Sequence, residues 1–306
     1  MKSKVFITGA TGFVGSHVCA ELEEKQIDYL AMVRSCKDIK QNREKYIEAS
    51  LQDKARMEQI LRDYQPDAVL HLAAVASPTF GEITQIYDVN VTGSENLLEA
   101  ARQSCKEGTR VVFASTAGVY GNQEVNLLHE KLPYNPVNHY SYSKMVMEFL
   151  SENYMDDLDI HIVRPFNMIG IGQQEKFLVP KLVNSYVKKI PTLKLGNMDT
   201  VRDYIDINYA AKVFVELLTK DVVNNRIYNI CTGKATKGTE LLQMLSDITG
   251  YQPEIEITSE FVRKNEIWHM VGDPKRLENF MKSAEKSKSV REILLEMVQM
   301  YQEENV

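Results

Sequence analysis

The sequence predicts an α/β fold, a doubly wound parallel sheet with a smaller, interleaved C-terminal domain. Short apolar runs alternate with longer helical stretches over the first half of the chain, which is typical of β-α-β units whose strands are covered by helices on both faces. A glycine-rich loop directly follows the first apolar run. We expect strands at residues 4–8, 29–33, 68–72, 110–114 and 160–163, and covering helices at 16–24, 54–63, 87–104 and 142–154.

The first expected strand, 4–8, runs into Gly9, Gly12 and Gly15, and the third glycine lies where a helix begins. Small residues in this context let the backbone approach the pyrophosphate of a dinucleotide, and the helix N-terminus favours its negative charge. The alternative is a flexible turn, but a strand and a helix flank the loop as a dinucleotide site requires. The loop therefore predicts a dinucleotide-binding site.

The second expected strand ends at Arg34 and Ser35, with no acidic residue at its tip. An acid at this place hydrogen-bonds the ribose hydroxyls of NAD, whereas an arginine can bind the 2'-phosphate of NADP. We therefore expect NADP(H) to be favoured over NAD(H), with Arg34 as the principal contact and Ser35 or Lys37 assisting. The alternative is that Arg34 only faces solvent.

Tyr140 and Lys144 are four positions apart, a spacing that on a helix puts the phenol and the ammonium on one face. The unperturbed pKa of tyrosine is about 10, so a nearby cation is needed to stabilise its phenolate at neutral pH. Together with Ser115 and Thr116 after the fourth strand, the pair suits proton exchange with an alcohol or ketone while a hydride moves. An isolated match would more simply be an exposed aromatic and a solvated lysine.

After Arg164-Pro165 the pattern changes, and the second half reads as a region threaded through the first. Residues 177–189 and 239–249 look helical, whereas 206–219 and 226–231 look like one more helix and strand of the sheet. We expect a dinucleotide-binding domain of residues 1–165 plus 199–233 and a substrate domain of residues 166–198 plus 234–306. A polar segment, 283–289, precedes a final helix at 290–303.

Composition disfavours several classes of protein. The net charge is -6, the pI is about 5.7, and basic residues are scattered, which disfavours a nucleic-acid partner. The four cysteines lie far apart and the six histidines include no His-x-x-x-His pair, so we expect reduced thiols and no metal. The first apolar stretch is too short for a signal peptide or a membrane span. We expect a cytoplasmic protein with no membrane partner.

Over nearly its whole length the chain resembles the extended short-chain dehydrogenase/reductases, an NAD(P)-dependent family of nucleotide-sugar epimerases, dehydratases and reductases with a Rossmann fold. The matching segments are residues 8–15, 71–74, 90–98, 115–121, 140–144, 164–167, 201–206, 228–233 and 271–273. Residues 164–173 with 177–180 are similar to the corresponding stretch of GDP-4-keto-6-deoxymannose reductases and their relatives.

The resemblance implies a role for each matching residue. Thr116 would hydrogen-bond the reacting sugar oxygen, Tyr140 would move its proton, and Lys144 would hold the nicotinamide ribose and lower the pKa of the phenol. The implied cofactor contacts are Gly9, Thr11, Gly12, Phe13, Val14, Gly15, Arg34, Ser35, Leu72, Ala73, Ala74, Lys144 and Pro165. The implied substrate contacts are Ser115, Asn167, Leu178, Arg202 and Arg263.

Among the implied substrate contacts, Asn167, Arg202 and Arg263 would bind the pyrophosphate, because planar guanidinium groups suit bidentate contacts to phosphate oxygens, and Leu178 would line the pocket for the base. Both arginines have alternatives in ion pairs with neighbouring acids. These are Asp203 or Asp206 for Arg202, and Glu260 or Glu266 for Arg263.

Two departures from the family pattern narrow the expected reaction. The 4,6-dehydratases carry acidic residues where this chain has Ala117 and Gly118, and the 4-epimerases mostly carry an acid where it has Arg34. We therefore expect NADPH-dependent reduction of a nucleoside-diphosphate 4-keto-6-deoxy sugar at C4. The alternatives are an NAD(P)-dependent nucleotide-sugar 4-epimerase and a non-catalytic dinucleotide-binding regulator.

The resemblance also implies a homodimer, formed through the expected helices 87–104 and 142–154. Their apolar residues could equally face only the sheet, because any surface helix has one apolar stripe. The sequence leaves open the base of the nucleotide, the identity of the sugar and its configuration at C4.

Overall fold

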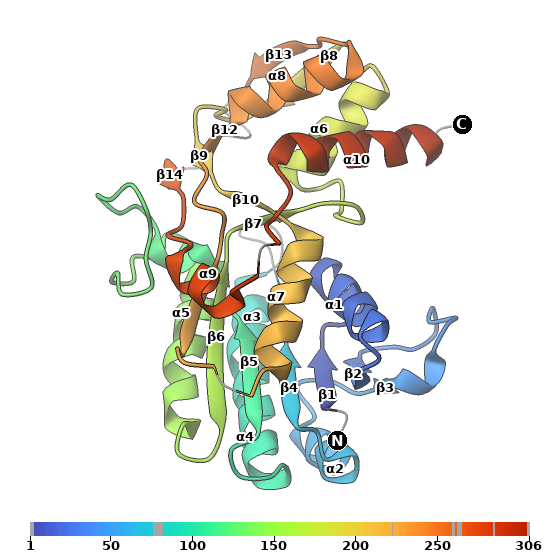
Figure 1. Ribbon diagram of the computed structural model, residues 1–306, viewed down its shortest axis with the longest axis vertical. Helices are drawn as coiled ribbons and strands as arrows, with labels where there is room; N and C mark the ends of the chain where they lie inside the picture. The colour runs from blue at the N-terminus through green and yellow to red at the C-terminus, as the bar shows by residue number, and fades with distance from the viewer. Residues whose placement is uncertain are drawn as a thin grey trace. The chain divides into compact units, whose positions relative to one another are not determined.

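The computed structural model describes residues 3–75, 82–221, 223–258, 261, 265–283 and 285–304 (Figure 1). The chain divides into two compact units, each formed by segments that are distant in sequence. Unit 1 contains Met1–Val119, Pro133–Pro165 and Ala211–Tyr228, and unit 2 contains Tyr120–Leu132, Phe166–Ala210 and Asn229–Val306.

A seven-stranded sheet forms the centre of unit 1. Its strands are β1 (Lys4–Thr8), β2 (Asp28–Val33), β3 (Tyr46–Glu48), β4 (Ala68–His71), β5 (Arg110–Ala114), β6 (Asp159–Pro165) and β11 (Ile227–Ile230). They lie in the order β11-β6-β5-β4-β1-β2-β3, and the ladders from β3 to β6 are parallel. The predicted doubly wound α/β fold is confirmed, and its winding reverses between β1 and β4.

Helices cover both faces of this sheet. They are α1 (Phe13–Glu24), α2 (Lys54–Tyr64), α3 (Ile83–Tyr87), α4 (Gly93–Ser104), α5 (His139–Leu150) and α7 (Ile207–Thr219), with short turns η1 (Arg43–Lys45), η2 (Asp88–Thr92), η3 (Ala117–Tyr120) and η4 (Ser151–Tyr154). Apolar side chains of α2, α4 and α5, such as Leu61, Leu98 and Met147, form one core with Val69 and Phe113 of the strands. In Figure 1, α1 and α7 lie on the other side of the sheet, toward the viewer.

Most of the expected elements of this unit are present, and the differences have local causes. The helix expected at 142–154 begins earlier, at His139, because the side chain of Asn138 accepts a hydrogen bond from the backbone N–H of Ser141 at 2.9 Å and caps it. The helix expected at 87–104 starts as a π-helical turn before α4. Strand β3 was not expected, because its three residues lie at the edge of the sheet and none is buried.

Unit 2 is built from helices and short strands. The helices are α6 (Leu178–Val187), α8 (Gly238–Thr249), α9 (Lys275–Met281) and α10 (Val290–Glu304), and the strands are β7 (Asn167–Ile169), β8 (Thr192–Leu195), β9 (Val201–Arg202), β10 (Tyr204–Asp206), β12 (Thr236–Lys237), β13 (Glu254–Ile257) and β14 (His269–Met270). The strands pair in small groups, β10-β7, β12-β9-β14 and β13-β8. Side chains of α6, α8 and α10, among them Leu182, Leu245 and Leu294, form the core of this unit.

The side chain of Asp203 joins three segments of unit 2. It is fully buried and accepts hydrogen bonds from the backbone N–H groups of Thr232, Gly233 and Gly272 and from the hydroxyl of Thr232. Burial raises the pKa of this carboxyl, and the hydrogen bonds oppose the rise. Asp203 thus fixes the segment that carries Arg202.

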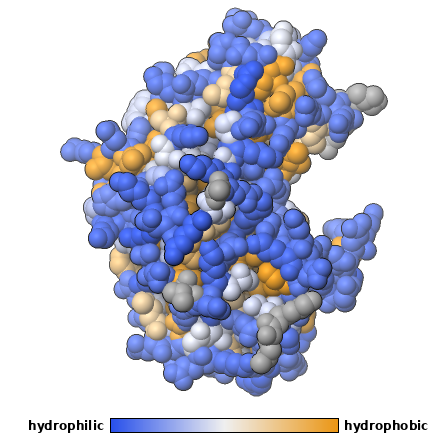
Figure 2. Space-filling model, viewed as in Figure 1, coloured by the Kyte–Doolittle hydropathy of each residue, from blue (hydrophilic) through white to orange (hydrophobic). Residues whose placement is uncertain are grey.

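The surface is mainly polar on the face drawn in Figure 2, where hydrophobic side chains form separate patches. Among the described residues, none of the helices is both long and apolar enough to cross a membrane.

Candidate active site

The glycine loop lies at the carboxyl end of β1, beside the end of β4. Gly9 has φ +79°, and a Cβ placed on it would lie 2.6 Å from the backbone nitrogen of Ala73. A Cβ on Gly15 would lie 2.2 Å from the carbonyl oxygen of Gly9. Both positions therefore require glycine, because the loop, the start of α1 and the segment Leu72–Ala73 pack backbone against backbone.

Gly12 differs from these two glycines, because it is exposed and a Cβ there would approach only the carbonyl oxygen of Gly9, at 3.3 Å. It caps the N-terminus of α1, where unpaired N–H groups attract an anion. At Gly12 the loop is thus open to solvent in front of the helix terminus. The cradle fits the pyrophosphate of a dinucleotide, held by the backbone of residues 12–15 with Thr11 exposed beside it.

A buried hydrogen-bond chain supports this loop from below. Thr8 Oγ1 lies 2.7 Å from His71 Nδ1 and accepts from the backbone N–H of Ala73 at 3.3 Å, and His71 Nε2 lies 2.9 Å from Ser94 Oγ. Burial, with a smaller contribution from the charge of Lys144, lowers the pKa of His71 to about 3. The imidazole is therefore neutral and acts as a spacer between β1, β4 and α4.

Arg34 and Ser35 follow directly on β2, and both are exposed. The hydroxyl of Ser35 accepts a hydrogen bond from the backbone N–H of Lys37 at 3.3 Å. Glu48 at the end of β3 lies close by, and its carboxylate accepts a hydrogen bond from the backbone N–H of Cys36 at 3.1 Å. The guanidinium of Arg34 thus stands at the tip of β2, where a ligand in solution can reach it.

Tyr140 lies in the first turn of α5 and is half-buried, as is Thr116 just beyond β5. Burial raises the pKa of the phenol to about 12, and a side-chain hydrogen bond with Thr116 opposes the rise. The amine of Lys144, one turn further along α5, is turned toward the backbone of β5.

Lys144 is buried on the same face of α5, and its Nζ donates to the carbonyl oxygen of Ala114 at 2.7 Å. Burial lowers the pKa of this amine to about 8, and the charge of Glu148 opposes the change. At neutral pH the group is therefore mainly an ammonium ion. The structure places Thr116, Tyr140 and Lys144 together at the carboxyl edge of the sheet, on the side of β4 and β5.

Ser115 has a different environment from the one that was expected. It is 2% exposed, and its hydroxyl donates a hydrogen bond to the carboxylate of Glu148. Because the hydroxyl proton of Ser115 is used in this hydrogen bond, a supporting role for Ser115 is favoured over a direct substrate contact. Glu148 itself was missed, although its position four residues after Lys144 repeats the spacing between Tyr140 and Lys144.

Asn167, Leu178 and Arg202 lie in unit 2. The side-chain nitrogen of Asn167 is buried and has no hydrogen-bond partner among the described residues, so it can donate to a ligand. Leu178 begins α6 and is 40% exposed. Arg263 lies outside the described residues.

Arg202 forms an ion pair with Glu266 at 3.0 Å and also donates to the carbonyl oxygen of Val201. The carboxylates of the alternative partners that the sequence suggested, Asp203 and Asp206, both accept hydrogen bonds elsewhere, that of Asp203 from residues 232, 233 and 272 and that of Asp206 from Asn208. This pairing joins residues far apart in the sequence, which is why local spacing did not suggest it.

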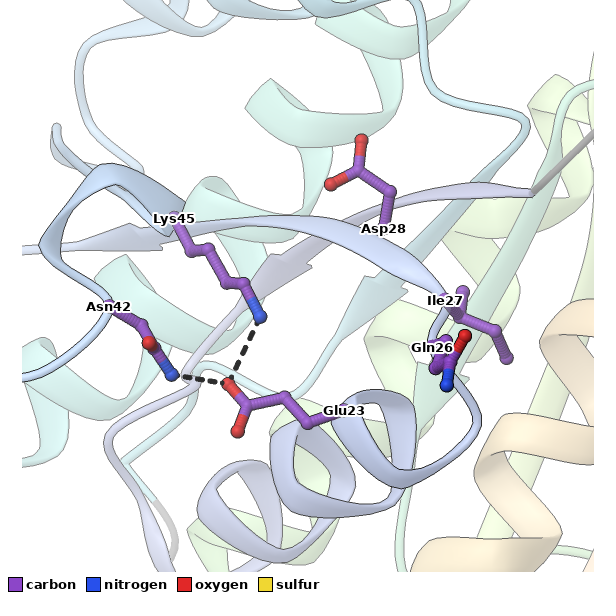
Figure 3. Close-up of a pocket in the computed structure, with 6 residues that line it drawn as sticks. All are labelled: Glu23, Gln26, Ile27, Asp28, Asn42 and Lys45. Carbon is purple, nitrogen blue, oxygen red and sulfur yellow. Dashed lines mark hydrogen bonds and ion pairs between the residues drawn. The ribbon is translucent and has the colours of Figure 1, made fainter.

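A surface hollow lies at the opposite edge of the sheet from the glycine loop. It has a volume of about 470 Å³ and is lined by Glu23, Gln26, Ile27, Asp28, Asn42 and Lys45 (Figure 3). Asp28 pairs with Lys4 at the amino ends of β2 and β1. The carboxylate of Glu23 accepts from Asn42 at 2.8 Å and from Lys45 at 3.2 Å, so these three polar side chains of the hollow bind one another.

In the described segments, no cluster of three or more His, Cys, Asp or Glu side chains could hold a metal ion. All four cysteines are free thiols, and burial raises the pKa of Cys19, Cys105 and Cys231.

The doubly wound sheet, the glycine loop at its switch point and the Thr116-Tyr140-Lys144 group define a dinucleotide-dependent enzyme of the Rossmann type. The sequence model of the NAD dependent epimerase/dehydratase family matches residues 5–231. The chain belongs to this family, and the predictions of an enzyme and of the extended short-chain dehydrogenase/reductase fold are confirmed.

Several known proteins are similar over almost the whole chain. The GDP-6-deoxy-D-talose 4-dehydrogenase of Aggregatibacter actinomycetemcomitans is 38% identical, over 96% of each chain. The GDP-6-deoxy-D-mannose reductase of Pseudomonas aeruginosa is 29% identical, over 86% of this chain and 85% of the relative. A crystal structure of a Burkholderia cenocepacia protein is 32% identical, superposes with a TM-score of 0.89 and covers 98% of both chains.

Proposed function

We propose that this protein is an NADPH-dependent reductase that converts the C4 carbonyl of a GDP-linked 4-keto-6-deoxyhexose into an alcohol. The names of the two relatives support the substrate class, because both enzymes act on GDP-linked 6-deoxyhexoses and one is named for oxidation or reduction at C4. The observation that carries the chemistry is the meeting of Thr116 and Tyr140 with the buried Lys144, whose Nζ donates to the carbonyl oxygen of Ala114 at 2.7 Å, at the carboxyl edge of the sheet.

Residues 9–15 with Arg34 would hold the dinucleotide, which when bound would supply the hydride. Tyr140 donates its phenolic proton to the C4 oxygen as the hydride reaches C4, so the carbonyl gains one hydride and one proton. A phenol whose pKa is about 12 is protonated throughout the neutral range, as the reducing direction requires. Thr116 hydrogen-bonds the same oxygen, and the ammonium of Lys144 stabilises the phenolate that forms.

A dehydratase is disfavoured by packing as well as by sequence. A Cβ on Gly118 would lie 2.5 Å from the hydroxyl oxygen of Ser141, and Ala117 is buried. An acidic side chain at either position would therefore displace its neighbours. The site therefore has no room at these positions for an acidic side chain that could transfer protons at C5 and C6.

Cofactor choice follows from the tip of β2. Arg34 is an exposed cation at the position where an NAD-selective site needs an acid. We assign its guanidinium to the 2'-phosphate of NADPH, with Ser35 and Lys37 beside it. In unit 2, the free amide nitrogen of Asn167 and the guanidinium of Arg202 are the proposed contacts to the diphosphate, and the exposed Leu178 lines the site of the base.

The test is the stoichiometry of the reaction with GDP-4-keto-6-deoxymannose. The wild-type enzyme should consume one NADPH for each sugar reduced, measured by absorbance at 340 nm and by chromatography of the product. Nuclear magnetic resonance of the product then gives its configuration at C4, manno or talo. UDP-linked and dTDP-linked 4-keto-6-deoxyglucose serve as controls for the base and the sugar.

A 4-epimerase remains the second candidate, because the family includes such enzymes and the same three residues can serve them. An epimerase would interconvert C4 epimers with no net change in the dinucleotide. If the protein epimerises a nucleotide sugar while NADPH stays constant, the proposed reduction is wrong.

A further inference from the structure

Three consecutive residues at the end of β5 each contact one residue on the same face of α5. The carbonyl oxygen of Ala114 accepts from Lys144, the hydroxyl of Ser115 donates to Glu148, and Thr116 hydrogen-bonds Tyr140. Tyr140, Lys144 and Glu148 follow one another at intervals of four, so they form one row along the helix. The proposed mechanism uses the first two members of this row and leaves the third unexplained.

Glu148 is 1% exposed, and its carboxylate is saturated with donors. Arg164, which is equally buried, donates from Nε at 3.1 Å and from Nη2 at 2.7 Å, and the hydroxyl of Tyr134 donates at 2.9 Å. The guanidinium carbon of Arg164 also lies 4.9 Å from the centre of the Tyr134 ring. The carboxylate of Glu148 is therefore held in one orientation by the donors of Arg164 and Tyr134.

This ion pair joins the two strands that flank the site to the helix that carries Tyr140. Arg164 follows Val163 on β6, and Val163 pairs with Ala114 of β5. A buried ion pair adds little net stability, because desolvation offsets its attraction. The geometry of the Glu148-Arg164 ion pair, by contrast, sets the position of β5 relative to α5. The Thr116-Tyr140 contact depends on this position.

We propose that Glu148, held by Arg164, is a positioning residue for catalysis: it holds the segment Ala114–Thr116 against α5 so that Thr116 stays bonded to Tyr140 and Lys144 stays beside them as an ammonium ion. The inference rests on the proposed function for its catalytic consequence only. Glu148 contacts neither substrate nor cofactor and acts through Ser115 and Lys144.

The charges around Lys144 make the second part of this role testable. Tyr140 and Glu148 lie on its own helix, and His71 on β4 is neutral because its pKa is about 3. Arg164 on β6 and the phenol of Tyr134 lie behind Glu148. Of these groups Glu148 is the anion, and its charge opposes the effect of burial on the pKa of Lys144, which is about 8.

The decisive variant is Glu148→Gln, which keeps the shape and an acceptor oxygen but removes the charge. We expect kcat to fall by at least about tenfold with the Kd for NADPH nearly unchanged, and the alkaline fall in kcat to move to lower pH by about one unit. Glu148→Asp retains the charge, so the alkaline fall in its kcat should occur at the same pH as in the wild type. Glu152→Gln is the matched control, because it removes a carboxylate four residues further along, from an exposed pair with Arg226.

A merely structural role predicts a different result. In that case Glu148→Gln would lower the melting temperature while kcat and its pH profile, measured well below that temperature, stayed at wild-type values. That outcome would overturn the proposal. If Glu148→Gln does not fold, Ser115→Ala decides the positional part: a loss of kcat with little change in melting temperature supports it, and unchanged kcat refutes it.

A measurement without substrate separates this proposal from the proposed function. The ¹⁵N signal of the Lys144 ammonium, assigned with Lys144→Met, can be titrated in the NADP⁺-bound protein. We expect a lower midpoint in Glu148→Gln than in wild type, and no change in Glu152→Gln. An inactive wild-type enzyme would reject the reductase assignment alone, whereas equal midpoints would reject the role of Glu148 alone.

Discussion

At the scale of single residues, the phenolic hydroxyl of Tyr140 is the group on which the proposed reduction depends. Tyr140→Phe removes this proton donor and leaves the ring. We expect kcat to fall by about 10² to 10⁴, the usual contribution of a general acid, while the Kd for NADPH stays within about twofold. Steady-state kinetics and fluorescence titration with NADPH measure the two quantities.

Tyr142→Phe is the control for this substitution. Tyr142 lies two residues further along α5, is 42% exposed and faces another side of the helix. Its loss of a hydroxyl should leave kcat unchanged. Full turnover by Tyr140→Phe would show that another group protonates the sugar oxygen.

Arg34 decides the choice between the two dinucleotides. Arg34→Ala removes a charge-assisted contact to the 2'-phosphate, so the affinity for NADPH should fall by about 10-fold to 100-fold while that for NADH changes little. Arg62→Ala removes an equally exposed cation at the C-terminal end of α2, on the opposite edge of the sheet, and should change neither affinity. Equal losses for NADPH and NADH in Arg34→Ala would refute the assignment.

At the scale of elements, the parts of the fold with strong local periodicity could be predicted from the sequence, and those fixed by distant partners could not. The five strands expected in the first half are present because buried parallel strands are uninterrupted apolar runs. The short strands of unit 2, such as β9 and β14, have too few residues to show a period. Their pairing depends on long-range contacts such as those of Asp203.

The candidate active site also has parts that the sequence predicts and parts that it does not. The glycine loop and the Tyr140-Lys144 pair have fixed local spacing, so the sequence indicates them directly. The contacts that arrange them, between Ser115 and Glu148 and between Glu148 and Arg164, cross from helix to strand. The sequence contained one signal for Glu148, the repeated interval of four, but nothing local indicated that its partner would be Arg164.

The start of α5 is an element whose capping residue also orders the catalytic tyrosine. Asn138 Oδ1 accepts from the backbone N–H of Ser141 at 2.9 Å, and Tyr140 lies within this first turn. Asn138→Ala should lower the free energy of unfolding by about 1 kcal/mol, measured by urea denaturation, and should also lower kcat. Asn138→Asp retains the cap and should preserve both values, so a loss as large as that of Asn138→Ala would refute the capping role.

At the scale of the whole molecule, His71 makes stability depend on pH. Its pKa is about 3 in the folded protein, against 6.5 as the ordinary value. Between these two pH values the unfolded chain binds a proton that the folded protein does not, so the free energy of unfolding falls as the solution is acidified. The contribution is complete above pH 6.5 and is lost progressively toward pH 3.

His71→Asn should therefore make the fall in stability between pH 6.5 and pH 3 shallower, although the variant will be less stable at neutral pH because it loses hydrogen bonds to Thr8 and Ser94. Denaturant titrations at several pH values measure this slope. His129→Asn, at an exposed position, is the control and should keep the wild-type slope. An unchanged slope in His71→Asn would mean that other groups cause the acid sensitivity.

Large apolar side chains of α3 and α5 remain exposed in the isolated chain, and they favour a homodimer. Ile83 is 53% exposed, Phe149 is 49% exposed and Tyr142 is 42% exposed, and two copies of one helical face can cover each other by twofold symmetry. Light scattering at micromolar concentration should give about twice the chain mass of 35.0 kDa.

The variant Phe149→Glu should give the monomer mass, because a charge placed in an apolar interface is costly to desolvate. The control Leu295→Glu, at a similarly exposed position on α10, should remain dimeric. A monomeric wild type, or a dimer that survives Phe149→Glu, would mean that these side chains do not form the interface.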